Sequence, residues 1–208
     1  MTSEPAPIIT VLISDDELLI RDAIASLLSL ESDIEVVGRA ASGPEALALA
    51  RQHRPQVALL DLQMPGLDGI GVTEQLRTEL PDCACMIVTS HARPGYLKAA
   101  LTAGARAFLS KTTSAAVLAT AVRTVAAGGR YVDPELAADA ISAGDSPLTA
   151  READVLALAA EGSPVDEIAD RVALSSGTVR NYLSSAVTKL AVTNRHEAAR
   201  KARQNGWI

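Results

Sequence analysis

Residues 57–69 read VALLDLQMPGLDG and are the part of the sequence that is most informative about the fold. The four apolar residues at 57–60 lack the alternation of a half-exposed strand, so they predict a strand that is buried on both faces. Asp61 follows this strand directly, and Pro65-Gly66 after it predicts a loop. A buried strand that ends on a carboxylate indicates a parallel sheet with a functional residue at its carboxyl edge.

The same arrangement continues on both sides of this stretch. Short apolar runs predict five strands, at 8–13, 34–37, 57–60, 86–88 and 107–109. Segments with helical periodicity lie between and after them, at 18–30, 44–52, 70–80, 94–103 and 115–127. Strands that alternate with helices predict an α/β fold, a five-stranded doubly wound parallel sheet of order 2-1-3-4-5 that closes at Gly128-Gly129.

The composition excludes several other classes of protein. An apolar content of 48% with 21% charged residues is typical of a globular chain, and 2% aromatic residues disfavour an all-β fold. No apolar stretch approaches the roughly 18 residues of a membrane span, and residues 1–7 carry no basic targeting signal, so we expect a cytoplasmic protein. Cys83 and Cys85 lie two apart in an apolar run, which favours core positions over a metal site.

A second, helical domain is predicted after the sheet. Pro134 follows a candidate cap at Asp133, and Gly144 is a stop signal, so a linker helix is expected between them. Beyond Asp145 no strand pattern occurs, and four helix signals follow, at 149–162, 163–174, 175–190 and from 193 onward. The expected domains are therefore 1–129, a linker at 130–146, and a four-helix helix-turn-helix unit at 147–208.

The charge is divided unevenly between these parts. Residues 1–145 carry 11 basic and 18 acidic residues, and residues 146–208 carry 8 basic and 7 acidic residues. From Ser175 onward there are six basic residues and a single acid, Glu197. The net charge of −6 therefore conceals a basic surface on the last two helices, of the kind that contacts nucleic acid.

The helix expected at 175–190 separates into two faces. An apolar stripe recurs at spacings of three and four from Val179 to Leu190, and polar side chains lie mostly away from it. Arginine, asparagine and serine side chains can hydrogen-bond to base edges. For an isolated helix, this polar face could be either a solvated surface or a DNA-binding surface. The helix and turn predicted just before it favour DNA binding. The candidate contacts are Thr178, Arg180, Asn181, Ser184, Ser185, Thr188, Lys189, Asn194 and Arg195.

Polar residues also follow the strands of the predicted sheet. Asp15 and Asp16 come after the first strand and Asp61 after the third, while Thr89 closes the fourth and Lys111 follows the fifth. Crowded carboxylates at one sheet edge indicate a hard divalent cation such as Mg²⁺, and a carboxylate can itself form an aspartyl phosphate. A lysine and a threonine hydroxyl are suited to bind the phosphoryl oxygens.

These residues, in the setting LDLQMPGLDG at 60–69 with Thr89-Ser90, resemble the receiver domain of two-component response regulators over residues 8–128. The resemblance implies that Asp61 is the phosphoacceptor, and that Asp15, Asp16, Asp61 and the Gln63 carbonyl are ligands of Mg²⁺. It also implies that Thr89 and Lys111 bind the phosphoryl group. Phe108 stands where the family has its switch aromatic residue, although a core role is equally open for it. Thr112 replaces the proline that follows the lysine in many receivers.

Residues 148–208 are similar to the LuxR or NarL type of helix-turn-helix, on the basis of LTARE at 148–152, EIA at 167–169 and GTVRNYLS at 177–184. A receiver joined to such a unit defines the NarL/FixJ family. RPGYL at 93–97, the run 180–185 and Gly206-Trp207 resemble its desaturase-regulator (DesR-like) branch. The segment GSPVD at 162–166 departs from the family's commoner pattern and adds an acid at Asp166.

The resemblance implies a transcription regulator rather than an enzyme. A sensor histidine kinase would phosphorylate Asp61, and this would promote a homodimer that binds inverted-repeat half-sites on double-stranded DNA. Surplus apolar residues on helices 18–30 and 115–127 suggest that the dimer forms there. Two alternatives are a regulator independent of phosphorylation, disfavoured by the complete acidic cluster, and an aspartyl phosphatase, disfavoured because Gln63 occupies the place of the second acid.

Overall fold

The computed structural model describes residues 7–90, 92, 94–143, 146–205 and 207–208. Packing divides the chain into two compact units. The sheet unit consists of residues 1–92 and 99–133, and the helical unit consists of residues 93–98 and 134–208. In the described part of the chain, no helix combines the length and the apolar composition needed to cross a membrane.

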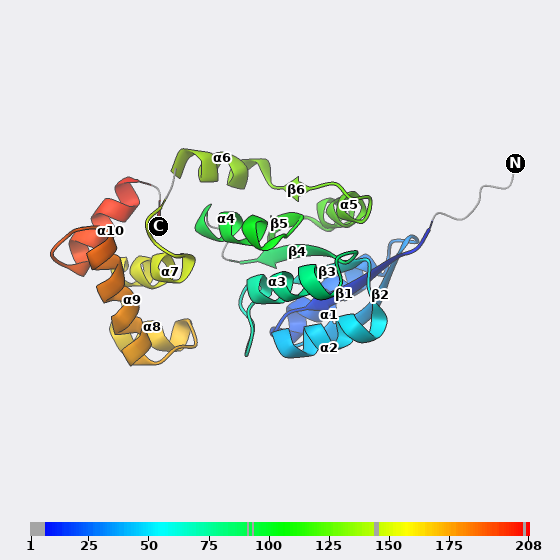
Figure 1. Cartoon of the computed structure of the whole chain (residues 1–208), viewed down its shortest axis with the longest axis horizontal. Helices are drawn as coiled ribbons and strands as arrows, with labels where there is room; N and C mark the ends of the chain where they lie inside the picture. Colours follow the sequence, from blue (N-terminus) through cyan, green and yellow to red (C-terminus); the bar gives the residue numbers. More distant parts are fainter. Residues whose placement is uncertain (1–6, 91, 93, 144–145, 206) are drawn as a thin grey trace, which may run out of the picture. The chain divides into compact units, whose positions relative to one another are not determined.

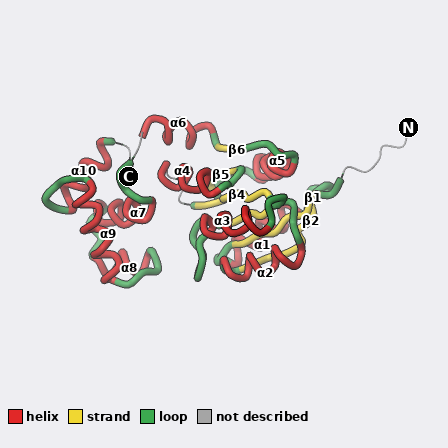
Figure 2. The backbone as a smooth tube through the Cα atoms, viewed as in Figure 1, coloured by secondary structure: helices red, strands yellow, loops and turns green. Residues whose placement is uncertain are grey.

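The sheet unit contains one parallel sheet with the strand order β2-β1-β3-β4-β5-β6 (Figure 1). Its strands are β1 (Ile9–Ser14), β2 (Ile34–Ala40), β3 (Val57–Leu60), β4 (Ala84–Thr89), β5 (Ala107–Ser110) and β6 (Tyr131–Val132). The helices between and after them are α1 (Leu18–Leu28), α2 (Gly43–His53), α3 (Gly69–Glu79) and α5 (Ala115–Ala126), while α4 (Pro94–Ala103) is divided, with its residues up to Lys98 in the helical unit. The predicted doubly wound parallel fold is confirmed, and in Figure 2 helices flank the yellow strands.

The prediction of five strands was wrong, because β6 adds a sixth. It consists of two residues, Tyr131 and Val132, which pair in parallel with Ala107 and Phe108 of β5. A strand of two residues is too short to appear as an apolar run in the sequence. The glycines at 128 and 129 also signal the end of a regular element, so the local pattern did not indicate this strand.

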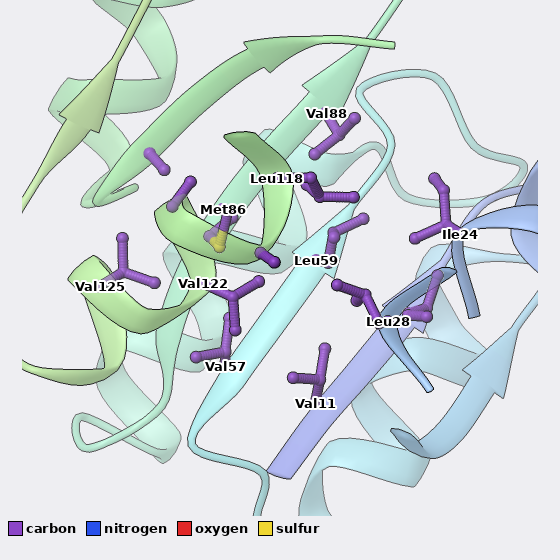
Figure 3. Packing of buried hydrophobic residues seen from close by; sticks show 14 of the residues in the cluster. Val11, Ile24, Leu28, Val57, Leu59, Met86, Val88, Leu118, Val122 and Val125 are labelled. Carbon is purple, nitrogen blue, oxygen red and sulfur yellow. The ribbon is translucent and has the colours of Figure 1, made fainter. Parts of the chain in front are cut away.

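Helices α1 and α5 cover the same face of the sheet. Their side chains Ile24, Leu28, Leu118 and Val122 meet strand residues in one buried cluster (Figure 3). The strand residues of this cluster include Val11, Val57, Leu59, Met86 and Val88. Since side chains alternate along a strand, Leu12, Leu60 and Ile87 point to the opposite face. There α2 packs against β1, β2 and α3, and α3 packs against β4.

The helical unit contains α6 (Pro134–Ala143), α7 (Ala150–Ala160), α8 (Val165–Arg171), α9 (Ser176–Lys189) and α10 (Arg195–Gln204). The predicted linker helix is therefore present as α6, while its expected stop at Gly144 and the boundary residue Asp145 lie outside the described residues. The predicted capping box is also present, since Thr149 accepts from the Glu152 amide and Glu152 accepts from the Thr149 amide. It fixes the start of α7.

The four helices α7–α10 enclose one apolar core. Leu156, Ile168, Val179 and Ala198, one from each helix, have no solvent-exposed surface. The predicted stripe of α9 faces this core, since Val179, Leu183, Ala186 and Leu190 are buried and Tyr182 and Val187 are partly buried. The opposite face of α9 is thereby left to solvent.

Candidate functional site

The carboxylates of Asp15 and Asp61 are brought together by strand register. Asp15 directly follows β1, Asp61 directly follows β3, and Ser14 and Leu60 are paired neighbours at the ends of these strands. The Asp61 amide donates to the Ser14 carbonyl at 2.7 Å, which extends the pairing beyond the strands. Two aspartates from distant parts of the sequence therefore meet at the carboxyl edge of the sheet.

Asp16 completes a cluster of three acids. One carboxylate oxygen from each of Asp15, Asp16 and Asp61 lies within 4.8 Å of the others. Asp15 and Asp61 are buried and Asp16 is exposed, so the cluster has a buried floor and an open side. Among the described residues it is the only group of His, Cys, Asp and Glu with this geometry. A set of carboxylate oxygens fits a hard cation with oxygen preference.

Lys111 is the cation that faces this cluster in the structure. Its Nζ atom lies 2.8 Å from Asp15 Oδ2 and 3.4 Å from Asp61 Oδ1. The Lys111 amide donates to the Thr89 carbonyl at 2.9 Å, so β4 and β5 fix where the side chain starts. With 8% of its side chain exposed, Lys111 is a nearly buried charge that depends on these carboxylates.

The electrostatics of the site favour a proton or a cation at Asp61. Burial raises the pKa of Asp61 to about 6, the Lys111 ammonium opposes this shift, and the Asp15 carboxylate adds to it. Burial lowers the pKa of Lys111, but its hydrogen bond to Asp15 and the nearby charge of Asp61 raise it overall above the ordinary value. Asp61 is thus a carboxylate that is costly to ionise unless positive charge is added beside it.

Glu17 is a member of the site that the sequence analysis missed. Its Oε1 atom lies 3.1 Å from Lys111 Nζ, and its amide donates to Asp15 Oδ1 at 2.9 Å. Its side chain is 60% exposed, so it holds the lysine from the solvent side. The sequence did contain a signal for this role, because Glu17 directly follows Asp16 and is the N-cap residue of α1.

The other predicted residues lie at the same edge or just below it. Thr89 is the last residue of β4 and is completely buried, and the Gln63 amide donates to Asp61 Oδ2 at 3.3 Å. Gly69 lies so close to the Asp61 carbonyl that a Cβ atom there would be 2.2 Å from its oxygen. Phe108, completely buried in β5 between Ile87 and Val132, lies in the sheet.

A second candidate site is the outer face of α9. Arg180, Asn181, Ser184 and Thr188 are exposed there, on the side away from the apolar core. The Thr188 hydroxyl donates to the Ser184 carbonyl of its own helix at 3.0 Å. Arginine and asparagine provide the paired donors and acceptors that recognise base edges in a major groove.

Two residues expected on that face have partners inside the helical unit instead. Ser185 donates to Glu152 Oε1 at 2.5 Å, and Lys189 donates to Glu152 Oε2 at 2.8 Å. Glu152 is 3% exposed, and although burial raises its pKa, these hydrogen bonds lower it overall below the ordinary value. Glu152, which the sequence analysis recognised only as a capping residue, therefore connects α7 to α9.

The remaining candidates lie at helix ends. Thr178 is half-buried in the first turn of α9, where its hydroxyl lies 2.8 Å from that of Ser175. The Asn194 side chain caps α10 by accepting from the amides of His196 and Glu197, each at 3.0 Å. Arg195 is the first residue of α10 and is half-buried. Outside α9, Asp166 accepts from Ser176 at 2.6 Å, so the unusual acid connects α8 to the start of α9.

Known families match both parts of the chain. Residues 11–123 match the response regulator receiver domain, and residues 146–202 match the bacterial regulatory proteins of the luxR family. The strand-end acids lie in the first match and the exposed face of α9 in the second. The matched families are regulators of transcription and not enzymes of the usual kind.

Relatives and solved structures agree with this assignment. The transcriptional regulatory protein DesR of Bacillus subtilis (strain 168) is 40% identical over 200 residues, covering 96% of this chain and 99% of DesR. The transcriptional regulatory protein UhpA of Escherichia coli (strain K12) is 40% identical over 199 residues, covering 96% of this chain and 100% of UhpA. The similarity to DesR agrees with the branch expected from the sequence, although Arg93 and Gly206 of those motifs lie outside the described residues.

The receiver domain of the response regulator NarL from Mycobacterium tuberculosis has a TM-score of 0.57 and 37% identity, covering 59% of this chain and 98% of that one. The response regulator RcsB, solved in a complex with DNA, has a TM-score of 0.62 and 26% identity, covering 95% of this chain and 98% of that one. With a receiver fold, a luxR-type helical unit and relatives along its whole length, this chain belongs to the NarL/FixJ family of two-component response regulators.

Proposed function

We propose that Asp61 accepts a phosphoryl group from a sensor histidine kinase, and that this modification controls DNA binding by the helical unit. The observation that carries the proposal is the Lys111 ammonium, 2.8 Å from Asp15 and 3.4 Å from Asp61 at the carboxyl edge of the sheet. It provides a positive charge beside the carboxylate that would be modified, where phosphoryl charge develops.

Asp61 is the nucleophile in this proposal. A carboxylate oxygen of Asp61 bonds to phosphorus while the phosphorus–nitrogen bond of the donor phosphohistidine breaks, and the bonding electrons stay with the imidazole. Lys111 and the Thr89 hydroxyl bind oxygens of the transferred group. Mg²⁺ would be held by Asp15, Asp16, Asp61 and the Gln63 carbonyl, and it would neutralise charge on the phosphoryl oxygens.

The phosphorylated state is proposed to favour a homodimer through α1 and α5. Exposed apolar side chains on α1 support this surface, since Leu18 is 63% exposed and Leu19 is 80% exposed. Small side chains such as Ala116 and Thr120 are exposed on α5, which contacts α1. Phe108 is the switch aromatic residue of the proposal, and because it pairs with Ile87 it lies on the face of the sheet opposite to α1 and α5.

DNA contacts are assigned to the exposed face of α9 and the ends of its neighbours. Arg180, Asn181 and Ser184 are proposed to read bases, and Thr188 lies on the same face. Thr178, Asn194 and Arg195 are placed for phosphate contacts, and Ser185 and Lys189 would have to leave Glu152 to contribute. A dimer would present two such helices to inverted-repeat half-sites of double-stranded DNA, in the cytoplasm. The proposed boundaries are 1–129, 130–146 and 147–208.

Footprinting on genomic fragments, with and without acetyl phosphate, tests the link between phosphorylation and DNA binding. We expect protected sites that need phosphorylation and disappear in Asp61→Asn. On a protected site, Arg180→Ala should weaken specific binding about tenfold or more and nonspecific binding less, since a good base contact contributes about 1–3 kcal/mol. Arg171→Ala is the control, because its guanidinium already contacts Glu161. Equal losses on specific and nonspecific DNA would make Arg180 a phosphate contact.

Sedimentation with the phosphoryl analogue BeF₃⁻ tests the dimer. Leu19→Ser should abolish dimer formation without preventing phosphorylation, because Leu19 lies on the proposed surface. Ile141→Ser is the matched control, since Ile141 of α6 is 82% exposed and lies outside that surface. An unchanged dimer in Leu19→Ser, or a monomer in the presence of BeF₃⁻, would contradict the proposed interface.

A further inference from the structure

A cavity of about 340 Å³ lies in the sheet unit, away from the acidic cluster. Its lining comes from the end of α3, the starts of β4 and β5, and the segment before β6, and it includes three arginines and both cysteines of the chain: Arg77, Arg106, Arg130, Cys83 and Cys85. The strands begin here, whereas Asp15 and Asp61 stand where strands end. We call it the arginine cavity, and it is separated from Asp61 by the length of the strands.

Strand pairing places two of the arginines beside each other. Arg106 and Arg130 directly precede Ala107 and Tyr131, which are paired in register, and the Tyr131 amide donates to the Arg106 carbonyl at 2.9 Å. Like charges on adjacent strands repel each other. This repulsion is a cost to folding that a bound anion would remove.

Two glycines lie against the arginine side chains. At Gly104, with φ +114°, an added Cβ would lie 2.8 Å from Arg77 Cδ, so the stem of Arg77 occupies that space. At Gly128, with φ +86°, an added Cβ would lie 3.7 Å from Arg106 Nη1, and Arg106 donates to the Gly128 carbonyl at 2.8 Å. The backbone therefore holds two guanidinium groups at the cavity.

No described acidic residue forms an ion pair with these three arginines. The guanidinium of Arg77 donates to the Thr102 carbonyl, at 3.4 Å, and that of Arg106 donates to the Gly128 carbonyl. Glu79, near the end of the same helix as Arg77, is bound at 2.7 and 2.9 Å by Arg51. The cavity thus gathers three permanent positive charges that form no ion pair with a described carboxylate, although Asp82 lies between the lining residues Pro81 and Cys83.

We propose that the arginine cavity binds a small molecule that carries a phosphate group. Guanidinium groups recognise phosphate oxygens through paired N–H donors, and three of them from separate segments suit the several oxygens of a tetrahedral dianion. The volume lies in the range, about 300–1,000 Å³, of pockets that hold small organic ligands, so it accommodates more than the phosphate alone. Such a ligand would give the receiver domain an input distinct from phosphorylation of Asp61.

Thiol labelling can report on this cavity alone, because the chain has two cysteines and both line it. Both thiols are buried, with Cys83 7% and Cys85 3% exposed, and a hydrogen bond between them lowers the pKa of Cys83 and raises that of Cys85, so we expect Cys83 to be labelled first. The experiment measures the rate of thiol modification in the full-length protein, in Mg²⁺-free buffer, with ribose 5-phosphate as the probe. We expect ribose 5-phosphate to slow labelling threefold or more and ribose to have no effect.

Variants locate the binding site. The double variant Arg77→Gln/Arg130→Gln removes two exposed charges and should abolish the protection, with at least a tenfold weaker affinity by calorimetry. Arg54→Gln, which removes an exposed arginine outside the cavity, should behave like the wild type. Circular dichroism verifies that each variant is folded.

Three outcomes would overturn the proposal. They are no protection of the wild type, equal protection in the double variant, and equal protection by ribose. Equal protection by citrate would overturn the phosphate assignment, because a carboxylate would then suffice.

Discussion

Asp61→Asn should stabilise the sheet unit at neutral pH in the absence of Mg²⁺. The folded pKa of Asp61 is about 6, and its ordinary value is 3.8, because burial disfavours the ionised carboxylate. A raised folded pKa means that the folded state holds its proton more tightly than the unfolded chain. The protonated carboxyl therefore contributes its full stability below the ordinary pKa, and this contribution is lost as the pH rises through about 6.

The magnitude follows from the difference between the two pKa values. At about 1.4 kcal/mol for each pH unit, ionised Asp61 costs roughly 3 kcal/mol above pH 6, most of which accrues between about pH 4 and pH 7. Asparagine has similar shape and no charge, so the variant escapes this cost. Between about pH 4 and pH 7, the free energy of unfolding of Asp61→Asn should therefore rise by roughly 2–3 kcal/mol relative to that of the wild type.

Scanning calorimetry of the full-length chain in EDTA measures the difference. The transition of the sheet unit is identified by Leu59→Ala, since Leu59 is 1% exposed in its core. Asp139→Asn is the control, because it makes the same change of charge at an exposed position of α6. The stability difference between Asp61→Asn and the wild type should grow from about pH 4 to pH 7. A difference that does not grow over this range, or that grows equally in Asp139→Asn, would refute the reasoning.

The other predictions concern stability. Arg123→Gln removes the ion pairs of α5 with Glu31 and Asp33, both at 2.6 Å. Because these groups are partly exposed, urea titrations should show a loss of stability of about 1 kcal/mol that becomes smaller at high salt. A loss of stability that does not change with salt would contradict an ionic origin. Glu152→Ala should destabilise the helical unit by about 1–3 kcal/mol, because it removes the capping box of α7 and the contacts with Ser185 and Lys189. The fluorescence of Trp207, which packs on the core, measures the loss, and an unchanged stability would contradict the connecting role of Glu152. Leu156→Ala should cost about 2–5 kcal/mol in the same assay, and a smaller cost would mean that the four-helix core is loosely packed.

Much of the acidic site could be predicted from the sequence, because most of its residues lie at or just after the end of a buried strand, and those ends could be located from the apolar runs. Once strands were expected to end near Ile13 and Leu60, parallel pairing placed Asp15 beside Asp61. The same reasoning placed Thr89 and Lys111 at that edge. The parallel register leaves little freedom for residues that directly follow paired strands.

The partners of long side chains could not be predicted. Periodicity assigns Ser185 and Lys189 to faces of α9, but Glu152, 33 and 37 residues away, binds both. The contact of Glu17 with Lys111 depends in the same way on two segments 94 residues apart. Side-chain pairing across elements is set by packing in three dimensions, which local pattern does not encode.

Phosphorylation of Asp61 is tested most directly by the mass of the intact protein after incubation with acetyl phosphate and Mg²⁺, followed by peptide mapping. We expect one added phosphoryl group, located on Asp61, that is absent in Asp61→Asn and absent when EDTA replaces Mg²⁺. A phosphoryl group on another residue, or equal incorporation in Asp61→Asn, would contradict it.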